Sequence, residues 1–290
     1  MSRPPPEFCD RAALYRARAR ALRRPAPFLH DLARAEIEER LTEVNRTFTA
    51  PAVVTAFPGF WASLRPDARL VPDAEVLPLE VGAHDLVVHA LCLHWAADPV
   101  GQIIQCARAL RPDGLFMAAL FGGQTLASLR ACLAEAEVEL TGGLSPRILP
   151  MADVRDLGAL LQRAGLALPV ADVVPVDVAY RDLSALASDL RGMGETNALS
   201  LRTHRPPPRA LFSAAERLYR KSRPRPDGRL PVRFDLVFLT GWAPHADQPR
   251  PLRPGSARAR LAEALGSVEY GTDGKAIGPV VSGRPPASDD

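Results

Sequence analysis

Two adjacent residues, His94 and Trp95, follow a short apolar segment and are of types that suit a reactive site. A histidine titrates near neutral pH, so His94 could act as a general base. It could equally be a packed histidine that makes a structural hydrogen bond. Trp95 suits the wall of a pocket better than a chemical step. The pair would face a ligand if Asp85–Ala90 is a strand, because open α/β sheets bind ligands where their parallel strands end.

A second group of polar residues lies in a segment punctuated by glycines, residues 190–197. Arg191, Glu195 and Asn197 could contact a substrate, since binding residues often lie in loops that a rigid scaffold holds. The alternative is a network of helix caps and turns. The sequence contains no nucleophile elbow, so a Ser-His-Asp triad is not predicted.

The cysteines and histidines do not predict a metal site. Cys9, Cys92, Cys106 and Cys132 form no CxxC pair, and no cluster has the spacing of zinc ligands. Four separate cysteines with mostly apolar neighbours indicate reduced thiols in a compartment like the bacterial cytoplasm. We therefore expect no metal and a cytoplasmic location.

The elements that must position these residues form a β-α-β unit. Asp85–Ala90 is an apolar strand, and an amphipathic helix then carries Val100, Ile103, Ile104, Ala107 and Leu110 on one face. Arg111–Gly114 should end the helix, because proline cannot continue it and glycine accepts positive φ. Leu115–Phe121 is apolar throughout, so the two strands should be parallel and buried on both faces.

Periodicity and capping residues predict further elements on both sides of this unit. Helices are expected at Asp10–Arg24 and Phe28–Val44, from the segment after Gly122 to Leu140, from Asp153 to Gly165, at Leu183–Leu190 and at Ala210–Arg220. Leu166–Val174 and Val176–Tyr180 are expected to form one strand or a bent pair of strands, and Pro231–Thr240 is expected to be the last strand.

Composition places the chain among globular proteins. Hydrophobic residues make up 47% and charged residues 24% of its 290 residues. The net charge is +3 and almost all cations are arginine, a bias typical of GC-rich coding, so a nucleic-acid partner is not predicted. No apolar run is long enough to cross a bilayer.

The basic N-terminus, with Arg16, Arg18, Arg20, Arg23 and Arg24, has two interpretations. One is a transit peptide. The favoured one is a first helix capped by Asp10 with its arginines in solvent, because Glu7 and Asp10 are unusual in transit peptides. We expect N-terminal helices over residues 1–45, a main domain over 46–265 and a disordered tail over 266–290.

Three motifs occur in order: DLVV at Asp85–Val88, LHW at Leu93–Trp95 and LRPDG at Leu110–Gly114. This series resembles the class I S-adenosylmethionine (SAM) methyltransferases. Four later motifs narrow the resemblance, which extends over Phe8–Leu265. They are FGG.TL at 121–126, LRGMGE.N at 190–197, GW..H at 241–245 and GSA at 255–257. The chain resembles the mitochondrial complex I assembly factor 5 family, which is close to the malonyl-carrier-protein methyltransferases of biotin synthesis.

The resemblance implies an α/β, Rossmann-like sheet of the class I methyltransferase type, with helices on both faces and an N-terminal helix pair. It implies SAM as cofactor and, in the mitochondrial member, arginine hydroxylation of a complex I subunit. The residues that match cofactor-binding positions are Gly59, Asp73 and Ala74. The residues that match a substrate pocket are His94, Trp95, Phe121, Arg191, Glu195 and Asn197.

The expected cofactor turn departs from the family pattern of an acidic residue followed by x-G-x-G-x-G. Over Pro51–Gly59, Val53 stands at the acidic position, Thr55 and Phe57 stand at glycine positions, and Gly59 alone remains. A side chain at such a position collides with a closely bound ligand. Phe57 should therefore project into the cofactor cleft.

The first half of the domain is also truncated. Trp61–Leu70 is too short for the two crossovers and the strand that precede the third strand in the superfamily, because one crossover needs about 10–12 residues. The carboxylate that would hold the ribose has no obvious position. Asp73 matches the adenine-contacting acidic residue, or is a surface carboxylate.

Three functions remain open. The first is an active SAM-dependent methyltransferase or arginine hydroxylase that acts on a protein or carrier-bound substrate. The second is a pseudoenzyme that binds a partner, such as a complex I subunit, during assembly. The third is a binder of another small molecule in the vacated cleft. The lost glycines favour the pseudoenzyme and predict weak or absent SAM binding.

Overall fold

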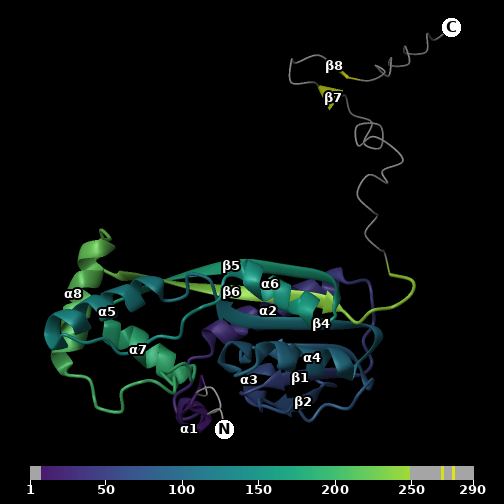
Figure 1. Ribbon diagram of the computed structural model, residues 1–290, viewed down its shortest axis with the longest axis horizontal. Coiled ribbons are helices and arrows are strands. Elements are labelled where there is room, and N and C mark those ends of the chain that lie inside the picture. Colours follow the sequence, from purple (N-terminus) through teal and green to yellow (C-terminus); the bar gives the residue numbers. More distant parts are fainter. Residues whose placement is uncertain (1–7, 249–268, 271–275, 278–290) are drawn as a thin grey trace, which may run out of the picture. The chain divides into compact units, whose positions relative to one another are not determined.

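The computed structural model describes residues 8–248, 269–270 and 276–277. The chain divides into two compact units, Met1–Ala246 and Asp247–Asp290. The first unit is built around a six-stranded sheet with the order β2-β1-β3-β4-β6-β5 (Figure 1). Strands β2, β1, β3 and β4 are parallel, whereas β6 is antiparallel to both β4 and β5. Strand β6 (Leu230–Trp242) confirms the strand expected at Pro231–Thr240.

The elements of the first unit follow the sequence predictions closely. The helices are α1 (Arg11–Ala21), α2 (Phe28–Glu43), α3 (Pro58–Trp61), the short 3₁₀ helix η1 (Leu93–Trp95), α4 (Pro99–Ala109), α5 (Ala127–Thr141), α6 (Val154–Arg163), α7 (Leu183–Gly192) and α8 (Arg209–Ser222). The strands are β1 (Pro51–Thr55), β2 (Arg69–Pro72), β3 (His84–Ala90), β4 (Leu110–Gly122), β5 (Ala167–Tyr180) and β6 (Leu230–Trp242).

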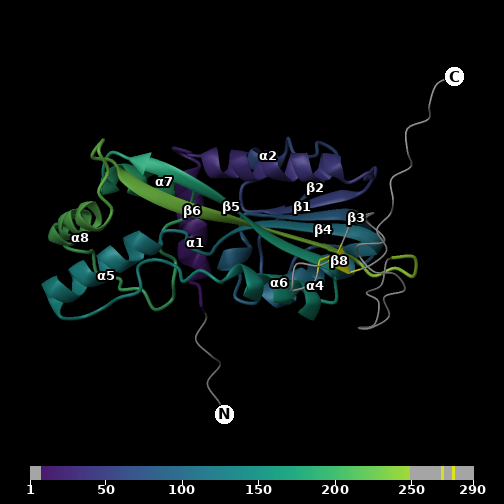
Figure 2. The same ribbon diagram turned by 90° about the horizontal axis from the view of Figure 1, so that it is seen from above.

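Both faces of the sheet are covered, as Figure 2 shows: α2 lies on one face, and α4 and α6 lie on the other. Strand β1 is buried from end to end, and its alternate residues, such as Val53 and Val54, enter opposite cores. Burial of these apolar side chains is the main stabilising contribution. Both views place α5, α7 and α8 beyond one end of the sheet, the end where β4 terminates (Figures 1 and 2).

One boundary prediction is wrong. Helix α4 ends at Ala109, and β4 starts at Leu110 instead of Leu115, so Arg111–Gly114 is an irregular part of the strand. Leu110 pairs with His84, and the register shifts before the next pair, Leu86 with Leu115. Asp113 has φ +63°, and its backbone N–H bonds to the carbonyl of Ala243. Pairing with neighbouring strands therefore outweighs the local tendency of this segment to form a turn.

The truncated first half is confirmed. Between β1 and β2 the chain forms only the four-residue helix α3, and β2 pairs directly with β1 in parallel. Strand β2 then leads to Asp73 and on to β3. The chain between β1 and Asp73 is therefore too short to form the additional strand and helices that the superfamily has there.

The second unit contains two short antiparallel strands, β7 (Glu269–Tyr270) and β8 (Ala276–Ile277). The GSA motif at 255–257 lies outside the described residues, as does most of the segment 266–290. The disordered tail and the domain boundaries at 45 and 265 stay predictions. Within the described part, no helix is both long and apolar enough to span a membrane.

Candidate functional site

The structure brings His94 and Trp95 together with Glu195, which lies 100 positions after Trp95. The two aromatic residues form η1, immediately beyond β3. The indole Nε1–H of Trp95 donates to Oε2 of Glu195 at 2.7 Å, and Nε2 of His94 lies 3.1 Å from the same oxygen. The His94 side chain is only 3% exposed. The carboxylate therefore anchors the end of β3 to the glycine-punctuated segment after α7.

Electrostatics keep Glu195 ionised. Burial raises the pKa of this carboxyl, but the interaction with His94 and the hydrogen bonds from His94 and Trp95 outweigh burial and lower the pKa below its ordinary value. A carboxylate that accepts two donors on one oxygen orients the imidazole as well as the indole.

Arg191 and Asn197 differ from Glu195 in what they contact. The Asn197 amide donates to the carbonyl of Pro146 at 2.8 Å, and its Oδ1 accepts from the N–H of Leu199 at 3.1 Å. Asn197 is thus part of the turn network that was the alternative prediction. Arg191 is exposed in the last turn of α7.

A cavity of about 240 Å³ lies between η1, the end of β4 and the helices α5 and α7. Its wall is mainly aliphatic and aromatic, and includes Trp95, Phe121 and Phe212. Arg191, Glu195 and Asn197 also line it. Five of the six residues predicted for a substrate pocket therefore share one cavity, and His94 lies behind Glu195. Trp95 is a pocket wall, as predicted.

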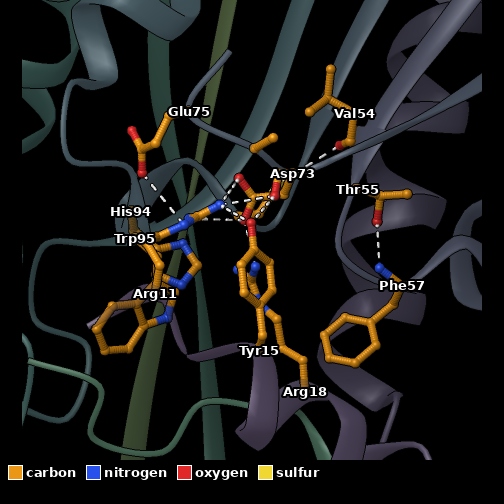
Figure 3. A network of polar contacts seen from close by, with 12 residues as sticks. Arg11, Tyr15, Arg18, Val54, Thr55, Phe57, Asp73, Glu75, His94 and Trp95 are labelled. Carbon is orange, nitrogen blue, oxygen red and sulfur yellow. Dashed lines mark hydrogen bonds and ion pairs between the residues drawn. The ribbon is translucent and has the colours of Figure 1, made fainter. Parts of the chain in front are cut away.

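Asp73 occupies the position where the resemblance places an adenine contact, directly after β2 (Figure 3). Its side chain is 1% exposed and pairs with Arg18, whose Nη1 lies 2.5 Å from Oδ2. Nη2 of Arg11 donates to the backbone carbonyl of Asp73 at 2.8 Å, and the Tyr15 hydroxyl donates to the same carbonyl at 3.2 Å. Three side chains of α1 therefore contact Asp73, and two of them, Arg11 and Arg18, pair with its carboxylate.

Two earlier predictions are wrong here. Asp73 is not a surface carboxylate, and Arg18 is not in solvent, because its side chain is 7% exposed. Burial alone raises the pKa of Asp73, but the charges of Arg18 and Arg11 outweigh burial and hold the pKa below its ordinary value. The carboxylate is therefore ionised and satisfied by the protein itself.

Phe57 is buried under the glycine-punctuated segment. A Cβ on Gly194 would lie 2.7 Å from Cζ of Phe57, and φ at Gly194 is +78°, so this position requires glycine. The Phe57 ring stacks on Phe60 at 5.1 Å and meets His30 edge-on at 5.2 Å. The ring is thus a core side chain that lies where the glycine turn of a SAM enzyme would be.

The other two residues that match cofactor-binding positions have separate environments. Gly59 is exposed in α3, and an added Cβ would meet nothing within 4 Å. The carbonyl of Ala74 accepts a hydrogen bond from the Gln102 amide at 3.0 Å. The space beside Gly59 is therefore open, whereas the backbone at Ala74 is held by Gln102.

These residues do not fit SAM. The adenine-contacting carboxylate is paired with two arginines, the glycine turn holds a buried phenylalanine, and the strand that would supply a ribose carboxylate is missing. Helix α1 packs against Asp73, and Phe57 is part of the core.

The sequence reasoning missed Arg11, Tyr15 and Arg18 as contacts of this cleft. Their spacing of four and three residues places them on one face of α1 (Figure 3). That spacing is readable in the sequence, but the basic residues of this helix were expected in solvent.

The four cysteines are buried thiols without disulfides. Burial raises the pKa of Cys9 to about 11 and raises those of Cys92, Cys106 and Cys132 as well, so none of them is a reactive thiolate at neutral pH. Among the described residues, no group of three or more histidine, cysteine or acidic side chains could hold a metal.

Comparison with known proteins places the chain in a family. A family model described as a methyltransferase domain matches residues 17–118. The zebrafish (Danio rerio) protein "Arginine-hydroxylase NDUFAF5, mitochondrial" is 35% identical over 79% of this chain and 72% of its own length. The human protein of that name is 39% identical over 70% of this chain and 58% of its own length.

A more distant relative is the malonyl-[acyl-carrier protein] O-methyltransferase of Laribacter hongkongensis, which is 34% identical over 66% of this chain and 62% of its own length. The strand order, with β6 antiparallel to β4, is consistent with the family that these relatives indicate. The chain belongs to the NDUFAF5 family of the class I methyltransferase superfamily.

Proposed function

We propose that this chain is a partner-binding member of the NDUFAF5 family that acts in complex I assembly without using SAM. The observation that carries the proposal is the enclosure of Asp73 by Arg11, Tyr15 and Arg18. A nucleoside would have to displace two arginines from a buried carboxylate and leave one or both charges unpaired. Breaking such a buried pair costs about 3–5 kcal/mol, which weakens ligand binding by a factor of roughly 100 to several thousand.

The cavity beside Trp95 supports the partner-binding half of the proposal. Its size suits one or two side chains of a partner protein, and its apolar wall resembles the pockets that receive anchor residues in protein interfaces. The polar residues at its rim, Arg191 and Asn197, would fix the orientation of the bound segment. The partner expected from the family is a subunit of respiratory complex I.

Calorimetric titration of the full chain with SAM and with S-adenosylhomocysteine tests the loss of the cofactor. We expect no heat of binding at ligand concentrations up to the millimolar range, with a SAM-binding methyltransferase as positive control. Micromolar affinity for either compound would contradict the proposal and favour an active methyltransferase or hydroxylase.

Complementation of a strain that lacks this protein tests the assembly role. Ala187→Trp on α7 should fill the cavity and lower the amount of assembled complex I. Ser184→Trp is the matched control, because Ser184 lies on the same helix, is exposed and does not line the cavity. Normal assembly with Ala187→Trp, or equal loss with both variants, would refute partner binding in this cavity.

A further inference from the structure

The cavity beside Trp95 has charged residues as well as an apolar wall. Three charged side chains line it: Arg147, Arg191 and Glu195. The other described residues that line it are apolar or neutral, and include Trp95 and Phe212. The charged residues restrict what the cavity can bind, because an occupant that covers them also removes them from water.

Two of the three charged side chains are already engaged within the chain. Nη2 of Arg147 donates to Oε1 of Glu137 at 2.5 Å, and its Nε donates to Oε2 at 3.1 Å. Oε2 of Glu195 accepts from the Trp95 indole at 2.7 Å, and the charge of Arg18 interacts favourably with the same carboxylate. Neither Arg147 nor Glu195 therefore calls for a charged group on an occupant.

Arg191 is the charged residue of the cavity that lacks such contacts. It lies in the last turn of α7, is exposed, and stands at the rim of the cavity. Its guanidinium forms no ion pair or hydrogen bond with the part of the chain that the structure describes. The rim therefore carries one positive charge without a counter-charge.

An occupant that closes the rim has to supply this counter-charge. A segment that inserts an apolar side chain between α5 and α7 would cover Arg191 and remove water from its guanidinium. A buried charge without a partner is strongly unfavourable, whereas a carboxylate can accept two parallel hydrogen bonds from a guanidinium. A basic segment would instead add repulsion. Oε1 of Glu195, which bonds to none of the described residues, needs only a main-chain N–H from the same segment.

We propose that the cavity beside Trp95 receives an acidic segment of the partner protein: a large apolar side chain enters the cavity, and an adjacent Asp or Glu pairs with Arg191. This inference rests on the proposed function, in which the cavity binds a partner. It adds the chemistry of the bound segment and makes Arg191 the residue that selects it.

Photo-cross-linking in cells that assemble complex I tests the proposal. The photoreactive amino acid p-benzoylphenylalanine takes the place of Phe212, which lines the cavity and is 44% exposed. Mass spectrometry of the cross-linked peptide should show an apolar residue next to Asp or Glu. A lipid adduct, or a segment without an acidic residue beside the cross-linked position, would overturn the proposal.

Variants of Arg191 test whether charge selects the segment. Arg191→Glu should lower the cross-link yield about tenfold or more and Arg191→Gln about fivefold, whereas Arg191→Lys should retain most of it. Arg163→Glu is the matched control, because Arg163 is also exposed in the last turn of its helix, α6, and does not line the cavity. Thermal unfolding checks that each variant is folded. Equal yields for Arg191→Glu and Arg163→Glu would contradict the proposal.

Charge reversal on the partner tests direct pairing. The acidic residue that the cross-link locates is replaced by arginine, and the amount of assembled complex I is measured with each form of the chain. The reversed partner should assemble better with Arg191→Glu than with the unmodified chain; no recovery would refute the pairing.

Ala187→Trp separates this inference from the proposed function. Normal assembly with Ala187→Trp would refute partner binding in the cavity altogether. Loss of assembly with Ala187→Trp but normal assembly with Arg191→Glu would leave partner binding intact and refute only the acidic segment.

Discussion

At the scale of single residues, the ion pair between Arg18 and Asp73 carries the proposal that this chain does not use SAM. Both side chains are buried, at 7% and 1% exposure, and Asp73 also has Arg11 beside it. The ion pair joins α1 to the end of β2, two segments that are 55 positions apart. Its removal should therefore affect stability as well as the cleft.

Arg18→Met should lower the free energy of unfolding by about 3 kcal/mol, because it leaves a buried carboxylate with one cation less. Urea unfolding followed by circular dichroism measures the change. Arg34→Met is the matched control, since Arg34 and Glu38 form a partly exposed ion pair within α2, worth about 0.5 kcal/mol. Similar losses in the two variants would show that the Asp73 cluster has no special role in stability.

Sequence reasoning identified most of the residues in the site but not their contacts. His94, Trp95 and Glu195 were all predicted as site residues, because each follows or lies in a segment with a readable motif. The shared carboxylate oxygen could not be predicted, since it joins positions 100 and 101 residues apart and depends on the docking of α7. Arg18 was placed in solvent because its partner is on another element.

At the scale of elements, the end of α7 and the segment after it hold the chain on both sides of α1. The N–H of Asp10 bonds to the carbonyl of Ala198, and Cys9 forms an antiparallel bridge with Leu199. At the other end the N–H of Ala26 bonds to the carbonyl of Gly192. These bonds keep the arginines of α1 over the carboxyl edge of the sheet.

Gly192→Ala should loosen α1. The new Cβ would lie 2.8 Å from both the carbonyl oxygen of Arg24 and the Cβ of Ala26, so the two segments must separate, at a cost of about 1–3 kcal/mol. Thermal unfolding and hydrogen exchange of α1 amides measure this effect. Gly59→Ala is the control, because a Cβ there meets nothing within 4 Å. Unchanged protection of α1 would argue against this anchoring.

The elements themselves were largely predictable. The apolar periodicity gave α2 within one residue and the strands β3 and β6 within two, because their burial pattern is local. The prediction that Arg111–Gly114 lies between the helix and the strand was wrong. The conformation of this segment follows from the pairing of Leu110 with His84 and from the bond to Ala243. The direct pairing of β2 with β1 was not predicted, although the short linker between them was recognised.

At the scale of the whole molecule, the pH dependence of stability reflects buried histidines. Burial lowers the pKa of His30 to about 4, and its Nδ1 accepts a hydrogen bond from the Trp61 indole at 3.0 Å. Burial also lowers the pKa of His89. Between pH 6.5 and pH 4 the unfolded chain binds protons that the folded chain does not, so the folded state loses stability as the pH falls.

His30→Gln should remove about 3 kcal/mol of this acid-induced loss, because the shift in pKa is about 2.5 units and the amide oxygen can still accept from Trp61. Urea unfolding at pH 7 and at pH 4 gives the difference for each protein. His204→Gln is the control, because His204 lies in an exposed loop. The same pH slope in His30→Gln and the unmodified chain would contradict the assignment.

The bridge between Cys9 and Leu199 has a consequence for biosynthesis. The N–H of Ser200 bonds to the carbonyl of Phe8 across 192 positions. Translation at about 5–20 residues per second therefore leaves α1 undocked for roughly 10–40 s, until its anchors emerge from the ribosome. During that interval the nascent chain exposes the carboxyl edge of β1 and β2, and a chaperone has access to a surface that the finished protein conceals.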